Sequence, residues 1–218
     1  MLADLVQFLP SLETLAAYTL AVVVLTITPG PDMTLFLGQT VSNGRMAGFA
    51  SMAGASTGMI VHTLFAAFGL SALLRASPEA FTLLKWIGAG YLLFLAVDAI
   101  RKGAGLTQDP ATMKRTSLGR AFRKGLLINL LNPKIILFFV TFLPQFVAAS
   151  DPHAGGKLVF LGLWFLVIAT PLVVPMILAA ERIAGFLKSS KRATRIFDWS
   201  FAGVMSAFAV KLLLTQAR

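Results

Sequence analysis

The sequence predicts an all-α integral membrane protein with six transmembrane helices, arranged as two inverted three-helix repeats in which the first and fourth helices are broken by proline. Of its 218 residues, 57% are hydrophobic and only 13% are charged, and the mean hydropathy is +0.80. A soluble core of this size cannot bury that much apolar surface. Two proline-containing breaks interrupt the apolar sequence at matching places in the two halves of the chain.

Six apolar stretches follow one another along the chain, and each has about the ~20 residues that a membrane-spanning helix needs. We expect spans at 12–39, 47–74, 81–100, 125–149, 157–180 and 199–214. A soluble helical protein would need helices with polar faces, and these stretches show little polarity. The chain is therefore predicted to form a single transmembrane domain over 1–218.

Charged residues alternate between the connections. The linkers at 101–124 and 181–195 are rich in Lys and Arg, whereas the linkers at 75–80 and 150–156 are nearly neutral and the N-terminal flank carries Asp4 and Glu13. Cytoplasmic loops carry the excess of Lys and Arg, so the basic linkers and the turn at Arg45 are predicted to be cytoplasmic, with both termini on the far side. The first stretch is interpreted as an uncleaved span, because an acidic flank is unlike a secretory signal.

A net charge of +10 can indicate a protein that binds nucleic acid, but the positions of the charges argue against this interpretation. The basic residues mark membrane topology, because they lie in alternate loops and not in a stripe interleaved with aromatic residues. We therefore expect the lipid bilayer, and not nucleic acid, as the partner of these charges.

A polar linker at 103–120 divides the chain into a first repeat at 10–102 and a second repeat at 121–218. Three spans in each half require the second half to be inverted relative to the first, as in many secondary transporters. The segment from Trp86 to Asp98 also aligns with the segment from Trp199 to Lys211, with Trp, Ala, Gly, Ala and Val coinciding at one constant offset.

The two breaks are Thr28-Pro29-Gly30-Pro31-Asp32 and Leu131-Asn132-Pro133-Lys134. Proline fits the first turn of a helix and Gly or Asn before it is a good N-cap, so each break is predicted to be a helix start inside the membrane and a site for an anion such as a carboxylate. Broken backbone in a bilayer is tolerated where it is buried or lines a cavity. Matched breaks indicate a substrate site between repeats; the alternative is a pair of proline kinks.

Asp32 and Lys134 lie inside apolar sequence, where a charge costs ~2.5–3.5 kcal/mol on insertion scales and is usually functional. They can form an ion pair or hold opposite ends of a zwitterion, with Asp32 taking the ammonium or a coupling proton. The alternatives are a structural pair and a Lys134 that reaches the cytoplasmic interface. The candidate substrate-binding residues are those of the breaks: Pro29, Gly30, Pro31, Asp32, Asn132, Pro133 and Lys134.

Ala50, Gly54, Gly58 and His62 are spaced four residues apart and predict a helix face of small residues that ends in an imidazole. Such a face favours close helix packing, either within the chain or in a homodimer. His62 is a second candidate for proton coupling beside Asp32; the alternative is a polar side chain bonded to a neighbouring helix.

The sequence lacks the motifs of the enzyme classes that could be expected in a membrane protein. There is no His-Glu-x-x-His pair for zinc and no aspartate cluster for Mg²⁺. The absence of cysteine excludes disulfides and thiolate metal sites. Ser71 lies near a span end with only His62 and His153 as bases. No enzyme activity, metal or cofactor is predicted, and a passive channel is the nearer alternative to a transporter.

The chain resembles the LysE/RhtB amino-acid exporters. The matching elements are the two proline motifs, Gly44-Arg45 with Ala47-Gly48, the glycine-rich stretch with His62, Lys85-Trp86 with Gly88 and Tyr91-Leu92, and Asn129 onward to Phe142-Leu-Pro144-Gln145-Phe146. This resemblance covers nearly the whole chain.

The resemblance implies a multi-pass exporter of amino acids or close derivatives in the inner (cytoplasmic) membrane, driven by proton antiport. In that family the position of Asp32 is often Asn, so the resemblance does not by itself make the carboxylate a proton carrier. It also leaves open another small solute or a metal ion, which related exporters carry, although Asp32, Asp98 and His62 are too few and scattered for a cation cage.

Overall fold

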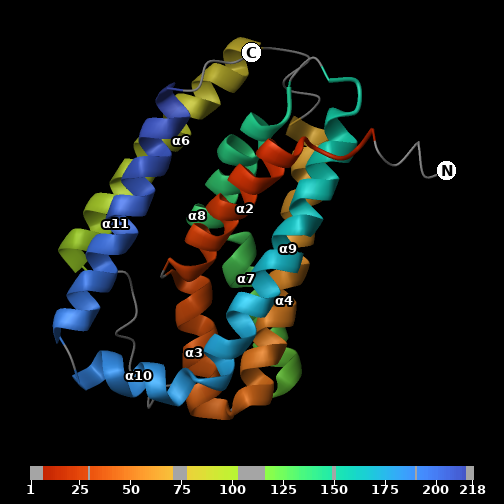
Figure 1. The fold of residues 1–218 in the computed structure, drawn as a ribbon. Helices are drawn as coiled ribbons and strands as arrows, with labels where there is room; N and C mark the ends of the chain where they lie inside the picture. The colour runs from red at the N-terminus through yellow and green to blue at the C-terminus, as the bar shows by residue number, and fades with distance from the viewer. Residues whose placement is uncertain are drawn as a thin grey trace.

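The computed structural model describes residues 7–28, 30–70, 78–102, 116–148, 151–189 and 191–214, and these are helical apart from short connections (Figure 1). The α-helices are α2 (Leu12–Ile27), α3 (Pro31–Asn43), α4 (Arg45–Leu64), α6 (Pro78–Lys102), α7 (Leu118–Leu130), α8 (Pro133–Leu137), α9 (Ala154–Leu178), α10 (Ala180–Ser189) and α11 (Lys191–Leu214). Three short segments have other helical forms: η1 (Phe65–Leu70) and η3 (Phe138–Phe142) are π-helical, and η4 (Leu143–Phe146) is a 3-10 turn.

Both predicted breaks occur, and each starts a new helix at proline. The axes of α2 and α3 differ by 50°, and α7 differs by 49° from the segment Pro133–Phe146. Pro31 is the first residue of α3 after the N-cap Gly30, and Pro133 is the first residue of α8 after the N-cap Asn132. A missing N–H does no harm in the first turn, where amide groups have no partner within the helix.

Two helices of the described residues are long and apolar enough to cross a membrane, Arg45–Gly69 and Ala154–Leu178, and each bent pair also qualifies when counted as one span. These four correspond to predicted spans one, two, four and five. The other two predictions, 81–100 and 199–214, fall within α6 and α11. Among the described residues neither helix meets the same criteria, and Trp86–Asp98 of α6 is a shorter apolar helix. The all-helical class and the broken first and fourth helices are confirmed.

The basic segment after α9 is more ordered than the sequence analysis expected. It was interpreted as a linker, but residues 180–189 form α10, which lies across one end of the molecule (Figure 1). Ala180 and Ile183 pack against Met33 and Leu37 of α3, so the helix has an apolar face toward the protein. The helix carries two basic residues, Arg182 and Lys188, and a short helix with one apolar face and basic residues is typical of a membrane interface.

Two basic segments of the described residues lie at the same end of the molecule. In Figure 1, α2 begins and α11 ends at the upper end, whereas α10 and the turn between α3 and α4 lie at the lower end. The turn at Arg45 and the basic helix α10 therefore share one end of the molecule, as the charge pattern predicts for a cytoplasmic side.

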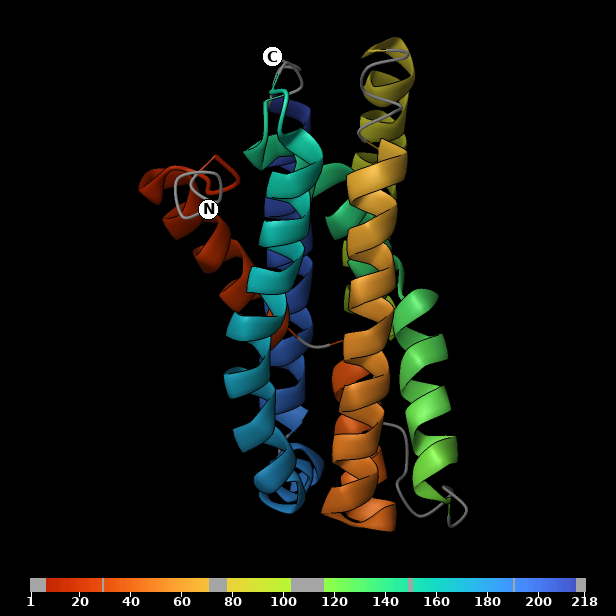
Figure 2. The same cartoon turned by 90° about the vertical axis from the view of Figure 1, so that its right-hand side faces the viewer.

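Helices α4 and α7 lie side by side and connect the two halves of the chain (Figure 2). A Cβ atom added to Gly54 would lie 2.0 Å from the Phe122 carbonyl oxygen, and one added to Gly125 would lie 2.0 Å from the Ser51 carbonyl oxygen. The two backbones touch where both helices carry glycine. The predicted small-residue face at Gly54 and Gly58 is thus used inside the chain.

The long helices α6 and α11 pack along each other; α6 also contacts α8 and η3, and α11 also contacts α10 and η3. Aromatic side chains fill the space around η3: Phe138 contacts Phe142 and Phe165, and Phe139 also contacts Phe165. This core fixes the segment that follows the second break against α9.

Candidate substrate site at the two helix breaks

Asp32, in the first turn of α3, is buried and is held by the other half of the chain. Its Oδ2 atom accepts hydrogen bonds from Asn129 Nδ2 at 2.8 Å and from Asn132 Nδ2 at 3.1 Å. Its Oδ1 atom is buried and has no hydrogen-bond partner among the described residues. A carboxylate can accept several hydrogen bonds, so one oxygen is available for a ligand.

Lys134, in the first turn of α8, extends its side chain from the second break to the first. Its Nζ atom donates to the carbonyl oxygens of Leu25 at 3.1 Å and Thr28 at 2.9 Å, at the C-terminal end of α2. The Leu25 carbonyl would normally accept from the residue four positions on, but that residue is Pro29 and has no N–H. The ammonium replaces the missing donor and lies at the negative end of the α2 dipole.

Each charged side chain is therefore held by hydrogen bonds to residues of the other half of the chain. Within the described part of the chain, the Lys134 ammonium bonds to these carbonyls and not to Asp32, which bonds to the asparagine amides. The predicted direct ion pair is not formed, and the alternative of a Lys134 that reaches the interface is also wrong, because the side chain is only 6% exposed.

Asn132 has two roles at the second break. Its Oδ1 atom accepts from the Lys134 backbone N–H at 3.0 Å, which caps α8, while its Nδ2 atom donates to Asp32. Asn129 lies three residues earlier, in the last turn of α7, and makes the shorter bond to Asp32. The two amides are thus directed at one carboxylate oxygen.

His62 lies beside this network without touching Asp32. Its Nε2 atom is 3.3 Å from the Asn129 carbonyl oxygen, and its ring stacks on Phe139 with centroids 5.7 Å apart. This contact agrees with the interpretation of His62 as a polar side chain bonded to a neighbouring helix, and the role in proton coupling stays a prediction. The contact also links His62 to the residue that holds Asp32.

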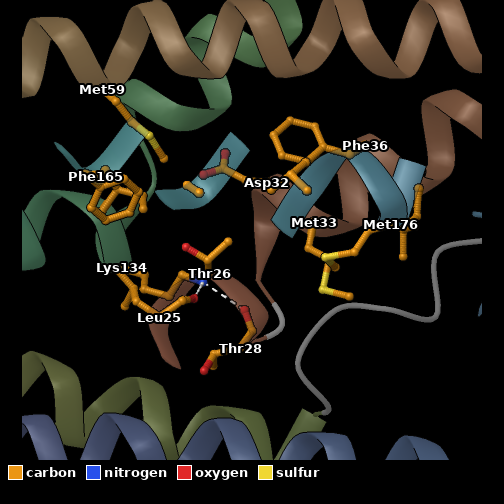
Figure 3. A pocket seen from close by; sticks show the side chains of 14 residues that line it. Leu25, Thr26, Thr28, Asp32, Met33, Phe36, Met59, Lys134, Phe165 and Met176 are labelled. Atoms are coloured by element: carbon orange, nitrogen blue, oxygen red, sulfur yellow. Dashed lines mark hydrogen bonds between the residues drawn. The ribbon is translucent and has the colours of Figure 1, made fainter. Parts of the chain in front are cut away.

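A pocket lies at the breaks, where α2, α3 and α8 meet α4 and α9 (Figure 3). Its polar lining comes from Thr26, Thr28, Asp32 and Lys134, and its apolar lining comes from α2, α3, α4, α8 and α9: Leu25, Met33, Phe36, Leu37, Met59, Ile135, Phe165, Ala169, Val173 and Met176.

Of the residues predicted for the site, Asp32 and Lys134 line the pocket. Asn132 is not part of its lining but donates a hydrogen bond to Asp32. Gly30 adjoins the Lys134 ammonium, since a Cβ atom there would lie 3.1 Å from Nζ. Pro31 and Pro133 begin their helices, and Pro29 lies outside the described residues.

The sequence analysis did not select Thr26, Asn129 or the apolar residues of α3 and α9. Asn129 had a detectable signal, because it lies three residues before Asn132 at the end of a helix. Thr26 and the apolar lining had none, since a threonine and a row of Met, Phe and Val are ordinary in a membrane helix.

An all-helical chain with two sharply bent candidate membrane spans has the architecture of a multi-pass membrane protein, and the family that it matches consists of translocators and not of enzymes. The model of the LysE type translocator family matches residues 23–216. The chain belongs to this family.

Two relatives illustrate the range of the similarity. The homoserine/homoserine lactone efflux protein of Salmonella typhimurium is 32% identical over 177 residues, which is 81% of this chain and 84% of the relative. The leucine efflux protein of Salmonella choleraesuis is 24% identical over 200 residues, or 92% of this chain and 94% of the relative. No solved structure matches the chain.

Proposed function

We propose that this protein is a secondary active exporter of amino acids or close derivatives across the cytoplasmic (inner) membrane, and that it works by proton antiport. One observation carries the proposal: Asp32 lines a cavity at a helix break with one carboxylate oxygen bonded to two amides and the other unpartnered among the described residues. The names of the relatives, which refer to efflux of homoserine, homoserine lactone and leucine, support the substrate class.

Coupling would follow from competition at Asp32. A buried carboxylate is strongly favoured to hold a proton or a cation, because an uncompensated charge in apolar surroundings is costly. The Oδ1 atom has room for a proton or for the ammonium of an amino acid, but not for both. A carrier that returns only with one of the two bound exchanges outgoing substrate for incoming protons.

The remaining break residues would bind the rest of the substrate. Lys134 has three donor hydrogens, two of which are used by Leu25 and Thr28, so it has one hydrogen bond left for a substrate carboxylate. Asn132, Pro31 and Pro133 would position these groups, and Gly30 leaves space beside the ammonium. We assign Pro29 the role of removing the N–H that Lys134 replaces.

We further propose that the chain crosses the membrane six times as an inverted repeat. The 25 residues of α6 and the 24 residues of α11 give helices about 37 and 36 Å long at ~1.5 Å per residue, enough for a hydrocarbon core of ~30 Å. The reciprocal contacts between the breaks agree with such symmetry. Rocking of the two repeats around the cavity would give alternating access.

His62 is a second candidate for the proton path. Its bond to the Asn129 carbonyl connects it to the amide that holds Asp32, so a change in the charge of Asp32 can reach the imidazole through one residue. A His62→Gln variant that still exchanges substrate but responds less to an imposed pH gradient would support this role, and an unchanged pH response would remove it.

The proposal is tested by counterflow in proteoliposomes with a panel of radiolabelled amino acids and an imposed pH gradient. Saturable uptake that rises with the gradient and is lost in Asp32→Asn supports an antiporter. Flux that never proceeds against a concentration gradient would indicate a passive channel instead. The absence of flux for every amino acid would overturn the substrate class and leave other small solutes or a metal ion. Among the described residues no group of three potential metal ligands occurs, which favours the amino acid.

A further inference from the structure

The cavity has two chemically different ends. At the breaks it carries hydroxyl and charged groups, and along α3 and α9 it is apolar. Figure 3 shows Met33, Phe36 and Met176 on the side of Asp32 that is turned away from Lys134. We call this region the apolar lobe and include Val173, which lines the cavity and packs with Phe36.

Two buried polar atoms at the charged end lack partners. Thr26 Oγ1 and Asp32 Oδ1 make no hydrogen bond within the described residues, and both residues line the cavity. Asp32 is 9% exposed, so water on the protein surface does not reach most of its side chain. Two such acceptors in one cavity match a ligand group with several donor hydrogens, which an ammonium provides.

The positions of these groups define the orientation of a ligand. In Figure 3 the Asp32 carboxylate points toward the side where Lys134 and Thr26 lie, and Met33 and Met176 lie on the other side of this residue. We infer that an amino acid with its ammonium on Asp32 reaches both sides of the pocket. Its carboxylate then points toward Lys134 and its side chain toward Met33 and Met176.

Resting on the function proposed above, we propose that the site selects zwitterionic amino acids with an apolar side chain of about the size of leucine or methionine. The ammonium binds Asp32 Oδ1 and Thr26 Oγ1, the carboxylate binds on the Lys134 side, and the side chain fills the apolar lobe. Neither Thr26 nor the lobe has a role in the sequence-based candidate set.

The composition of the lining also predicts what the site does not distinguish. Met33, Met59 and Met176 are flexible and adapt to different shapes, so leucine, isoleucine and methionine should bind with affinities within a few-fold of one another. A hydroxyl in the lobe loses its water and finds only apolar neighbours, which weakens homoserine by roughly 10- to 100-fold. The second ammonium of lysine is excluded more strongly.

The first test measures counterflow of radiolabelled leucine in proteoliposomes containing the full chain, with unlabelled amino acids as competitors. We expect leucine, isoleucine and methionine to compete at similar concentrations, and homoserine to need roughly 10- to 100-fold more. Alanine should be weaker than leucine because it leaves the lobe empty. Homoserine or lysine that competes as well as leucine would overturn the inference.

The second test changes the volume of the lobe. Val173→Phe fills it, so the ratio of leucine affinity to alanine affinity should fall at least about 10-fold, since the site distinguishes side chains by burial of a few methyl groups. Val167→Phe is the matched control on the same helix, because Val167 is 57% exposed and lines no part of the cavity. An unchanged ratio in Val173→Phe would overturn the placement of the side chain.

The third test concerns the ammonium. Thr26→Val removes the hydroxyl at nearly constant volume and should weaken leucine, methionine and alanine by a similar factor of roughly 10, the usual effect of losing a hydrogen bond to a charged group. A change that depends on the competitor's side chain would place Thr26 at the wrong end of the ligand.

These results separate the two proposals. If the protein exchanges homoserine or lysine for protons but does not bind leucine, the export function stands and the apolar-lobe inference fails. If no amino acid is exchanged, and none raises the melting temperature of the purified protein, both fail.

Discussion

The two helix breaks have nearly the same bend angle and opposite chemistry. Their bends differ by only one degree, and both new helices begin at proline. The first break contributes a carboxylate and free carbonyl oxygens, whereas the second contributes an ammonium and two amides. Each break therefore provides hydrogen-bond partners for polar groups of the other, and both halves of the chain contribute to the candidate site.

The caps of the two new helices differ for a related reason. At the second break the Asn132 side chain caps α8, whereas at the first break Gly30 provides no side-chain cap. A side chain at position 30 would lie against the Lys134 ammonium. The absence of a side chain at Gly30 therefore leaves space at the first break for the charged group of Lys134.

Asp32→Asn should have the largest effect on transport. An asparagine can keep its oxygen toward Asn129 and Asn132, so the contacts between the breaks survive, but an amide donor replaces the unpartnered oxygen. We expect pH-driven exchange to be lost while the amount of protein in the membrane stays the same. Counterflow under an imposed pH gradient measures this directly.

Glu13→Gln is the control for Asp32→Asn, because Glu13 is an exposed acid at the start of the same bent helix pair. It should behave as wild type. Exchange that persists in Asp32→Asn and still follows the pH gradient would remove Asp32 from the mechanism.

Lys134→Met should have the largest effect on stability. Methionine keeps the length of the side chain but leaves the Leu25 and Thr28 carbonyls without their donor, at a cost of ~1–3 kcal/mol for each buried acceptor. We expect the melting temperature in detergent to fall by roughly 5–15 °C. Asp32→Asn should lower it much less, because its contacts are retained.

The matched control is Lys157→Met, which removes a lysine that pairs with Asp151 near the surface at 2.5 Å. Exposed ion pairs contribute only ~0–1 kcal/mol, so this variant should melt within about 3 °C of wild type. Similar melting temperatures for the two lysine variants would contradict the view that Lys134 closes the end of α2.

The sequence was sufficient to predict the breaks, because proline and its N-cap act through local chemistry at Gly30, Pro31, Asn132 and Pro133. It also identified Asp32 and Lys134, since a charge inside apolar sequence is conspicuous. It did not predict how these charges are satisfied. That depends on which helix faces meet across the chain, and one sequence contains no information on the distance between Asp32 and Asn129.

The apolar lobe and α10 were missed for different reasons. Met33 and Met176 resemble any buried pair, so only their place beside Asp32 gives them a role. The basic residues around α10 were interpreted as topology signals, and this hid the helical spacing of Ala180 and Ile183. Charge counting detects the side of the membrane on which a segment lies, but not whether it folds there.

Asn132→Ala should have an intermediate effect, because it removes both the cap of α8 and one of the two amides on Asp32. We expect a loss of about 1–3 kcal/mol in the free energy of unfolding and exchange that is weakened without being abolished. Asn129→Ala is the matched variant, since it removes an amide on Asp32 but no cap. If the cap contributes, Asn132→Ala unfolds at the lower temperature of the two; the reverse order would assign the stability to the Asp32 bonds alone.

Gly30→Ala should have the smallest effect and is the most direct test of why the two caps differ. The backbone at Gly30 is extended, with φ of 176°, so alanine adopts it without strain. The new Cβ atom would lie 3.1 Å from Lys134 Nζ, and this flexible tip can move by a few tenths of an ångström. We expect a destabilisation below about 1 kcal/mol and a weakening of exchange by about two-fold, because the ammonium moves relative to both the α2 carbonyls and the cavity.

Gly90→Ala in α6 is the control: a Cβ atom there meets nothing within 4 Å, and replacing a helical glycine should stabilise by up to ~1 kcal/mol. Opposite signs in the two alanine variants, measured by thermal unfolding, would mean that Gly30 is required for the space it leaves to Lys134. A stabilised Gly30→Ala with undiminished exchange would mean that the missing cap at the first break has another cause.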